Sequence, residues 1–564
     1  MVNRKKTDLT YLAVFVLALF LVNVASSFVF ERFDFTAEKR YTLSENTKST
    51  LSQLREPLQV TVYLEGDFPA GFKRLRNATR DILSDYRSYS NKNISYHFVN
   101  PSSGNQQDQE QAYVDLVEKG LQPTNLTVDT EDGRTQKIIF PGALITYQGR
   151  QMAVNLFQSK MGASPEDVLN NSIQNLEYAF TSAVRKIISG GRPRVGFTEG
   201  NGELSDLQLS DAMASLQFGY EAGRVNLNAI TFEGLDKLKL LVIPKPDTEF
   251  TETQKYKIDY FLMKGGSILW AVDNVNAELD SLRSAGSQLA FAKKLNLDDM
   301  LFKYGARINY NLVADMSCAQ IPLNVGNLGQ QAQIQLVPWL FYPIFVPVST
   351  HPLVKNLDGI RSEFASTIDT IAVPGVKTQV ILSTSPFNRL LRVPSIISLQ
   401  MVEQEPDIEA FRSNPKPVGV LLEGTFPSVF SRRPVPAGID GPQRIPEKSA
   451  PAKMVIIADG DILKSQISSQ DGSPFPLGFD RYTQQQFGNK NFLLNIADYL
   501  TDDSGIIELR NKEIKIRLLD KARVKDERLS WQLFNILGPL GLIAVFALIY
   551  HYYRKRKYGS LVTA

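Results

Sequence analysis

The chain has 564 residues, and 62 Lys and Arg stand against 59 Asp and Glu, for a formal net charge of +3. This length predicts several domains. The nearly balanced charge argues against a nucleic-acid-binding protein, which needs a strong basic excess. One cysteine excludes an internal disulfide, a four-cysteine metal site and a C-x-x-C redox centre, and three histidines argue against a histidine-rich metal centre. We therefore expect no resident metal and no cofactor.

Two uncharged apolar segments lie near the chain ends, at residues 9–30 and 531–550. At about 1.5 Å per residue, each can cross a hydrocarbon core of about 30 Å. Basic residues 4–6 precede the first segment and basic residues 554–557 follow the second, so both termini are predicted to be cytoplasmic, with tips 1–8 and 551–564. The alternative for the first segment is a cleaved signal peptide, and for the second a buried core helix.

Residues 31–190 predict the first outer domain, an α/β domain. The expected elements are a strand at 58–65, a helix over 72–86, a strand at 94–99, a hairpin at 143–157 that turns at Gln148 and Gly149, and one long helix over 165–188. The strand, helix and strand form a β-α-β unit that is thioredoxin-like in outline but has no cysteines. Thiol redox chemistry is therefore excluded.

Residues 191–510 predict a second outer domain, and residues 511–530 a juxtamembrane segment. The expected elements are a strand within 193–199, a helix ending near 216, apolar strands at 238–244, 267–272 and 453–463, and helices over 251–264 and 489–500. Uniformly apolar strands that alternate with helices predict a doubly wound α/β sheet with buried parallel strands. The stretch 400–452, rich in Pro and Ser, is expected to form loops or an insertion.

Polar loops follow the predicted parallel strands at 198–203, 244–249 and 273–278. Open α/β sheets bind ligands beyond the carboxyl ends of their strands. The candidate ligand rim consists of Glu199, Asn201, Glu203, Asp247 and Asp273. The rim is suited to a polar or cationic ligand, with a carboxylate-bound divalent cation as one candidate; the alternative is ordinary turn and helix-capping chemistry. The first loop has neither G-x-G-x-x-G spacing nor the lysine of a P-loop, and its glutamates would repel phosphate.

No constellation of residues predicts catalysis. Cys318 lies in an apolar, strand-like context, and the nearest outer histidine in sequence is His351, so a structural thiol is the favoured interpretation. His97 alternates within a strand as a packed or surface residue. Asp459 and Asp461 follow a buried strand, where turn or capping roles are favoured over a metal site or a phosphoryl acceptor. We expect no enzymatic activity.

An aromatic and proline-rich stretch, 338–347, offers a candidate partner-contact patch. Its aromatic side chains are Trp339, Phe341, Tyr342 and Phe345. The prolines prevent a regular helix, and an exposed apolar patch of this kind would mark a protein or membrane contact. The alternative is packing into the domain core.

Several segments resemble the GldG family of gliding-motility-associated ABC transporter auxiliary proteins. They are residues 33–86, VGFTEGNGE (195–203), KMVIIADGDIL (453–463) and NKNFLLNIADYL (489–500). The resemblance implies an inner-membrane, ABC-type complex with a separate permease subunit and a separate ATP-binding subunit, and a periplasmic outer region. It also implies that the central domain is similar to class I glutamine amidotransferases or flavodoxins without their catalytic residues. Family members commonly have His at the position of Asn201.

The leading hypothesis is a non-enzymatic, membrane-anchored periplasmic subunit that acts with a permease and an ATPase and contacts the lipid bilayer, with self-association possible and no nucleic-acid partner. A ligand-binding module that uses the acidic rim is the first alternative. A periplasmic hydrolase that depends on Cys318 and a structural scaffold of a motility or secretion machine are the others.

Overall fold

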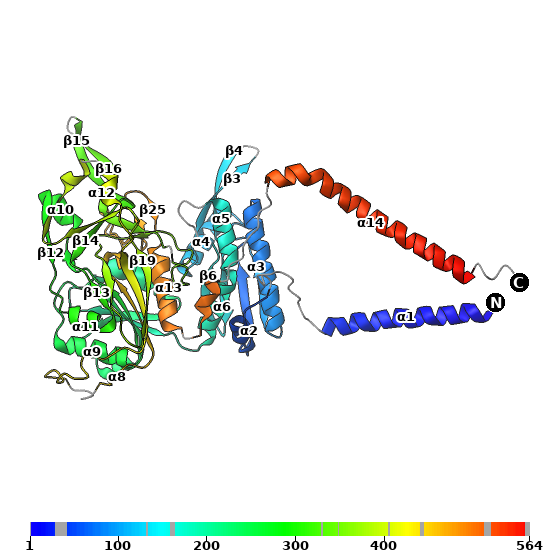
Figure 1. Cartoon of the computed structure of the whole chain (residues 1–564), viewed down its shortest axis with the longest axis horizontal. Coiled ribbons are helices and arrows are strands. Elements are labelled where there is room, and N and C mark those ends of the chain that lie inside the picture. Colours follow the sequence, from blue (N-terminus) through cyan, green and yellow to red (C-terminus); the bar gives the residue numbers. More distant parts are fainter. Residues whose placement is uncertain are drawn as a thin grey trace. The chain divides into compact units, whose positions relative to one another are not determined.

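The computed structural model describes residues 2–28, 42–130, 133–157, 164–328, 331–347, 349–403, 406–439, 445–502, 504–511 and 521–558, and the statements below concern these residues. The chain divides into a large unit, Met1–Asp34 with Tyr41–Lys512, and a smaller unit, Phe35–Arg40 with Glu513–Ala564. The architecture is mixed α/β, as the alternation of strands and helices predicts (Figure 1).

The first domain of the large unit is built on a four-stranded sheet in the order β2-β1-β5-β6. Its elements are α2 (Glu45–Ser52), β1 (Leu58–Val62), α3 (Ala70–Tyr89), β2 (Ile94–Phe98), α4 (Gln106–Glu118), β3 (Thr124–Thr130), β4 (Gly133–Ile139), β5 (Gly142–Tyr147), β6 (Arg150–Asn155), α5 (Pro165–Gln174) and α6 (Leu176–Ile188). Strands β1 and β2 are parallel and joined by α3, so the predicted β-α-β unit is present.

Two local predictions in this domain have different outcomes. The hairpin of β5 and β6 turns at Gln148 and Gly149, whose φ angles of 49° and 77° are those of a tight two-residue turn. The single helix expected over 165–188 is instead two helices. The chain breaks between them at Asn175, whose N–H donates to the carbonyls of Asn171 and Ile173.

The second domain is built on a seven-stranded sheet in the order β19-β22-β23-β10-β9-β7-β8. Its strands and principal helices are β7 (Arg194–Glu199), α7 (Asp206–Gln217), β8 (Glu221–Asn226), α8 (Phe232–Asp236), β9 (Leu238–Pro244), α9 (Glu252–Met263), β10 (Ser267–Ala271), β19 (Val376–Ser383), β22 (Pro417–Gly424), β23 (Ala452–Ile457) and α13 (Asn489–Thr501). Strands β7, β8, β9, β10 and β23 are parallel, whereas β22 and β19 are antiparallel additions at one edge.

Alternate side chains of the central strands enter two separate cores. In β9, Leu241 and Ile243 pack with α9 on one face, while Leu240 and Val242 pack with α7 and α13 on the other. Both faces of the sheet are therefore covered, which explains why the strand reads as a continuous apolar run. The Thr251–Gln254 capping box at the start of α9 is also present.

The expectation of loops throughout 400–452 is wrong for β22. This strand pairs with β19 and β23, and residues 418–422 are all buried. Pro417 stands at the first position of the strand, where a missing N–H is tolerated. The composition of the flanking segments hid a short interior strand.

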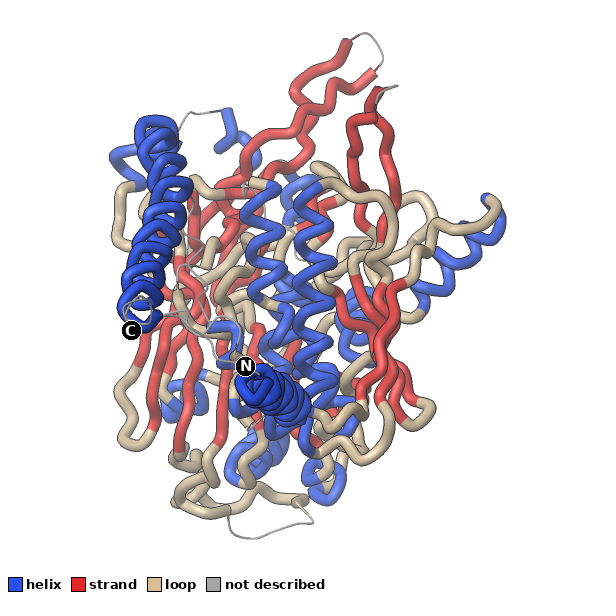
Figure 2. The backbone as a smooth tube through the Cα atoms, turned by 90° about the vertical axis from the view of Figure 1, so that its right-hand side faces the viewer, coloured by secondary structure: helices blue, strands red, loops and turns tan. Residues whose placement is uncertain are grey.

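Smaller elements fill the connection between β10 and β23 and the segment beyond it. They are β11 (Val275–Asn276), α10 (Leu279–Ala285), β12 (Ser287–Ala292), α11 (Asp298–Tyr304), β13 (Ala306–Ile308), β14 (Asn311–Asp315), β15 (Cys318–Leu328), β16 (Gln331–Phe345), β17 (Ile360–Arg361), β18 (Ile368–Thr370), β20 (Asn388–Arg392), β21 (Ser395–Ser398), η1 (Leu399–Glu403), α12 (Ile408–Phe411), η2 (Asp461–Leu463), β24 (Phe479–Asp480), β25 (Gln485–Gln486) and η3 (Ile506–Asn511). The hairpins β3–β4 and β15–β16 project from their domains (Figure 2).

The two domains of the large unit are joined through Asp498 on α13. Its carboxylate accepts hydrogen bonds from Tyr178 Oη at 2.8 Å and from Tyr220 Oη at 2.5 Å, and Lys186 Nζ lies 2.5 Å from it. Tyr178 and Lys186 belong to α6 of the first domain. Arg185 of the same helix pairs with Asp502 at 3.2 Å. One carboxylate thus accepts donors from both domains.

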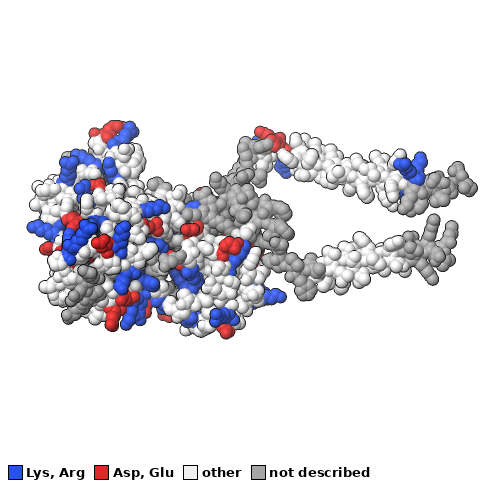
Figure 3. Space-filling model, turned by 60° about the horizontal axis from the view of Figure 1, so that its bottom comes forward, with Lys and Arg blue, Asp and Glu red and all other residues white. Residues whose placement is uncertain are grey.

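Two apolar helices complete the description. In α14 (Lys521–Tyr558), the stretch Val524–Arg556 is long and apolar enough to cross a membrane, and it includes the predicted span at 531–550. In α1 (Val2–Phe28), the apolar stretch Leu9–Val24 is shorter, so both interpretations of the N-terminal segment remain open. Neither residues 9–24 nor residues 531–550 include Lys, Arg, Asp or Glu, and basic side chains mark the end of α14 (Figure 3).

Candidate functional site at the carboxyl end of the central sheet

The loops after β7 and β9 lie where the strand order of the parallel sheet reverses, which is the usual ligand crevice of such a sheet. Asn201 occupies this position and is only 3 % exposed. Its amide donates to Gln254 Oε1 and Glu249 O, both at 3.2 Å, and accepts from Gln254 Nε2 at 2.9 Å. Its backbone carbonyl accepts from the N–H groups of Asp247 and Thr248. The chain itself therefore closes the crevice.

The carboxylates of the predicted rim are engaged within the protein. Glu199 pairs with Arg224 at 3.3 Å and Asp247 with Lys293 at 2.8 Å. Glu203 accepts a hydrogen bond of 2.6 Å from the backbone N–H of its neighbour Asn201. The structure brings the first two loops together, but as a packed contact and not as an open acidic cleft. The capping and turn interpretation fits these contacts better than the ligand rim does.

Asp273, the fifth rim residue, belongs to a buried group that we call the ionic cluster: Lys245, Asp273, Glu278, Asp459, Asp461 and Lys464. Lys245 Nζ lies 2.6 Å from Asp461, 2.7 Å from Glu278 and 3.3 Å from Asp273. Lys464 Nζ lies 2.9 Å from the second oxygen of Asp461. The cluster therefore joins the connections that follow β9, β10 and β23.

Backbone groups complete the cluster. Gly460 N–H donates to Asp273 at 2.6 Å, and Asp461 N–H donates to Asp459 at 2.7 Å. Asp459 also accepts hydrogen bonds from the Ser362 hydroxyl and from the Glu363 N–H. A Cβ at Gly460 would lie 2.4 Å from Lys245 Cβ, so a larger residue there would displace the lysine. The carboxyl end of the sheet is fixed by charge as well as by packing.

Burial sets the protonation of this cluster. Desolvation, together with the nearby Asp273 and Asp461 carboxylates, raises the pKa of Asp459 well above its ordinary value. Desolvation also raises the pKa of Asp273 and Glu278. Burial opposes the charge of Asp461 as well, but Lys245 and Lys464 lower its pKa. The three neighbouring carboxylates raise the pKa of Lys245 against the desolvation that would lower it. The lysines thus favour the charged form of Asp461, whereas the surroundings of Asp459 favour its protonated form.

Carboxylate oxygens of Asp273, Glu278 and Asp461 lie within 4.8 Å of one another, a spacing that would suit a cation. The Lys245 ammonium contacts all three and so takes the position of that cation. The donor set therefore fits a structural lysine better than the divalent cation considered from the sequence.

The aromatic patch predicted at 338–347 is a strand, β16, with a buried inner face. The exposed fractions are 1 % for Trp339 and Phe345, 4 % for Phe341 and 3 % for Tyr342. Phe341 and Tyr342 pack against Phe364, and Phe345 belongs to the core of the central sheet. The prediction of a partner-contact surface on these side chains is wrong, because all four are packed in the hydrophobic cores of the fold.

The candidate nucleophile and histidines have structural environments. Burial, reinforced by Asp315, raises the pKa of the Cys318 thiol to about 12, which suppresses the thiolate form. His351 Nδ1 accepts from Leu353 N–H, its ring packs against Tyr499, and burial lowers its pKa. His97 lies 3.1 Å from Thr61 Oγ1 on the neighbouring strand.

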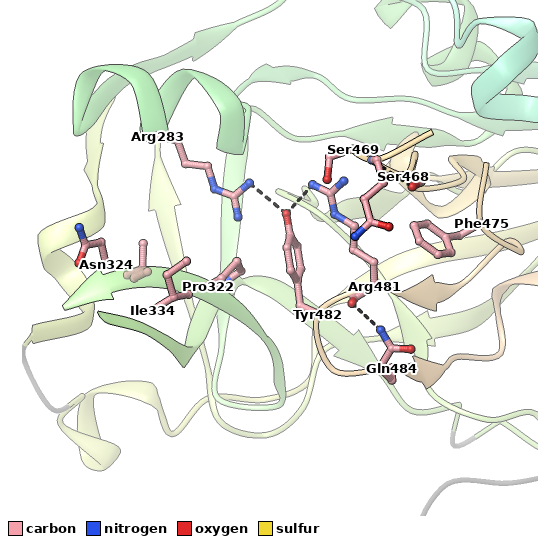
Figure 4. A pocket seen from close by; sticks show the side chains of 12 residues that line it. Arg283, Pro322, Asn324, Ile334, Ser468, Ser469, Phe475, Arg481, Tyr482 and Gln484 are labelled. Atoms are coloured by element: carbon pink, nitrogen blue, oxygen red, sulfur yellow. Dashed lines mark hydrogen bonds between the residues drawn. The ribbon is translucent and has the colours of Figure 1, made fainter. Parts of the chain in front are cut away.

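A pocket of about 670 Å³ lies between the hairpin β15–β16 and the segment that follows β23. Arg283 comes from α10, which follows β10, and Arg481 and Tyr482 come from the turn between β24 and β25. Arg283 Nη1 donates to Tyr482 Oη at 3.0 Å and Arg481 Nη2 donates to it at 2.6 Å. The two guanidinium groups approach this oxygen from different sides (Figure 4). We call this the arginine pocket.

A family model described as an ABC-type uncharacterized transport system matches residues 192–496, which is more than half of the chain. The chain belongs to this family. A domain of unknown function (DUF7088) matches residues 37–146. An uncharacterized protein of Borreliella burgdorferi is 20 % identical over 571 residues, covering 98 % of this chain and 99 % of the relative. The N-terminal domain of mmIFT52 is similar at 14 % identity, with a TM-score of 0.31, over 58 % of this chain and 100 % of that one.

Both the ionic cluster and the arginine pocket fall inside the part of the chain that matches this transport-system family. Sequence reasoning found Asp273, Asp459 and Asp461 but missed Lys245, Glu278 and Lys464, and it missed the arginine pocket entirely. Lys245 directly follows the buried strand β9. A lysine at that position is a signal that could have found the cluster, since the ends of parallel strands meet at one edge.

Proposed function

We propose that the chain is a non-enzymatic, membrane-anchored auxiliary subunit of an ABC-type transport complex, acting with a separate permease and a separate ATP-binding subunit. Membership of the transport-system family supports this role. The apolar helix α14 supports membrane anchoring. The single observation that carries the proposal is that one chain combines the family's matched region with this helix.

The proposal includes the placement of the outer region in the periplasm of a bacterial inner membrane, with both termini cytoplasmic. The basic side chains after α14 support this orientation, because positive residues favour the cytoplasmic side. The order of the five parallel strands supports a flavodoxin-like second domain, and the order β2-β1-β5-β6 supports a thioredoxin-like first domain. An association with gliding motility rests on the resemblance alone.

Copurification tests the central partnership. The tagged full-length chain, expressed at its native level, is extracted from its own membranes in a mild detergent, and the bound proteins are identified by mass spectrometry. We expect an ABC permease and its ATPase in a fixed ratio to the chain. Recovery of the chain alone, or with non-transport proteins only, would contradict the proposal. An unrelated single-span membrane protein with the same tag controls for carry-over.

N-terminal sequencing of the mature protein tests the first anchor. A chain that begins at its encoded N-terminus keeps α1 and supports two anchors. A chain that begins near Phe28 has lost it, and then α14 is the remaining candidate span among the described helices.

A ligand-binding module is the second candidate function, favoured by the arginine pocket. Its volume of about 670 Å³ is within the usual range of small-molecule sites. The acidic rim does not support this function, because Glu199, Glu203 and Asp247 each form an ion pair or a hydrogen bond with another group of the chain.

A further inference from the structure

The arginine pocket brings two positive charges to one oxygen atom. Arg283 and Arg481 both donate to Tyr482 Oη within 3.0 Å, and both guanidinium groups also lie over the Tyr482 ring, at 5.4 and 4.8 Å from its centre. The backbone of Tyr482 is fixed by Asp480, which is fully buried and accepts a hydrogen bond from the Tyr482 N–H at 3.1 Å. The turn therefore presents its charges in a fixed geometry.

The pocket contains no carboxylate that would neutralise these charges. None of its lining residues is Asp or Glu. Among the described residues, Arg481 has no carboxylate within 4.0 Å, and Arg283 has one, Asp280, at 4.0 Å and 98 % exposed, where screening by water leaves little attraction. Two like charges held together without a counter-charge repel each other, so an anion bound between them gains attraction and removes that repulsion.

The remaining donors point to an oxyanion. A guanidinium has five N–H donors in a planar fork that matches carboxylate and phosphate oxygens. The Tyr482 hydroxyl accepts in both of its bonds to arginine, which leaves its own proton to be donated. Ser469 adds a hydroxyl group to the same lining. Apolar side chains, Phe475, Pro322 and Ile334, form the other walls (Figure 4).

We infer that the arginine pocket binds a small organic anion, with a phosphate or carboxylate group held by Arg283, Arg481 and Tyr482 and an apolar part held against Phe475, Pro322 and Ile334. Arg283 comes from the long connection after β10, and Arg481 and Tyr482 come from the segment after β23. The inference rests on the pocket and not on the proposed transport role, because binding is measured on the chain alone.

Isothermal titration of the full-length chain in detergent micelles tests this site. The probes are phenyl phosphate and benzoate, which share the anionic and apolar features, and benzylamine, their cationic counterpart. We expect one site per chain for at least one of the two anions and none for benzylamine. The tighter anion identifies the oxyanion that the site prefers. Absence of binding by both anions would overturn the inference.

Arg283→Met should weaken binding of that anion at least about tenfold, because a charge-assisted hydrogen bond is lost. Arg412→Met is the matched control, since Arg412 is 66 % exposed on its side chain and pairs with Glu409 outside the pocket. Equal affinity of wild type and Arg283→Met would overturn the inference. If Arg283→Met does not fold, Ile334→Asp serves instead. Ile334 is 69 % exposed, so the change is tolerated, and the new carboxylate should repel the anion to a similar extent.

Discussion

The ionic cluster and the arginine pocket differ in how their charges are compensated. In the cluster, Lys245 contacts three carboxylates, and Lys245, Asp273, Asp459 and Asp461 are buried. In the pocket, Arg283 and Arg481 both donate to the Tyr482 hydroxyl beside an open cavity. Buried charges persist only when they are paired, so the cluster is built for structure. Arginine charges that border a cavity and are not paired with a buried carboxylate are available to a ligand.

The largest effect that tests this contrast is expected for Lys245→Met. The change leaves Asp273, Glu278 and Asp461 without their shared counter-charge, and breaking a buried ion pair costs about 3–5 kcal/mol of the free energy of unfolding. Chemical denaturation of the full chain in detergent, followed by tryptophan fluorescence, measures it. Lys73→Met is the control, because Lys73 is half exposed and should change stability by less than about 0.5 kcal/mol. A loss below about 1 kcal/mol for Lys245→Met would show that the cluster is not a structural centre.

A smaller loss is expected for Asn201→Ala, about 1–3 kcal/mol, because the Nε2 group of the buried Gln254 would lose its acceptor, Asn201 Oδ1. Glu199→Ala, in the same loop, removes a carboxylate that is 42 % exposed and should cost less than about 0.5 kcal/mol. The two variants are compared in the same denaturation experiment. Equal effects would contradict the account of Asn201 as the side chain that closes the crevice.

The raised pKa of Asp459 predicts a pH dependence of stability. Its folded pKa is raised mainly by desolvation, so the folded protein keeps a proton that the unfolded chain releases above about pH 4. The contribution of Asp459 to stability therefore falls as pH rises from about 4 towards its folded pKa, by at most about 1.4 kcal/mol per pH unit. Asp459→Asn cannot titrate. The stability of wild type minus that of Asp459→Asn should decrease as pH rises from about 4 towards the folded pKa of Asp459, and a difference that rises over this range would contradict the assignment.

Local sequence patterns predicted much of the fold. The apolar runs of β9, β10 and β23 depend on neighbouring residues, and the structure has a buried strand at each. Strand β8 (EAGRVN) was missed because only one of its six residues is buried, and β22 because of its proline-rich surroundings.

The charged sites could not be predicted in the same way, because they join distant residues. Lys245 and Asp461 are separated by 216 positions, and Arg283 and Tyr482 by 199. The sequence around each of these residues does not indicate which distant residue it contacts. The aromatic patch was predicted to be exposed from its composition alone. Its burial depends on packing with Phe364, which is distant in the sequence.

The most direct test of the central claim, that this chain is a membrane-anchored auxiliary subunit of an ABC-type transport system, is a cryo-electron microscopy structure of the assembly extracted from its native membrane. We expect particles in which this chain contacts a permease and its ATP-binding subunit. Particles that contain the chain without either subunit would contradict it.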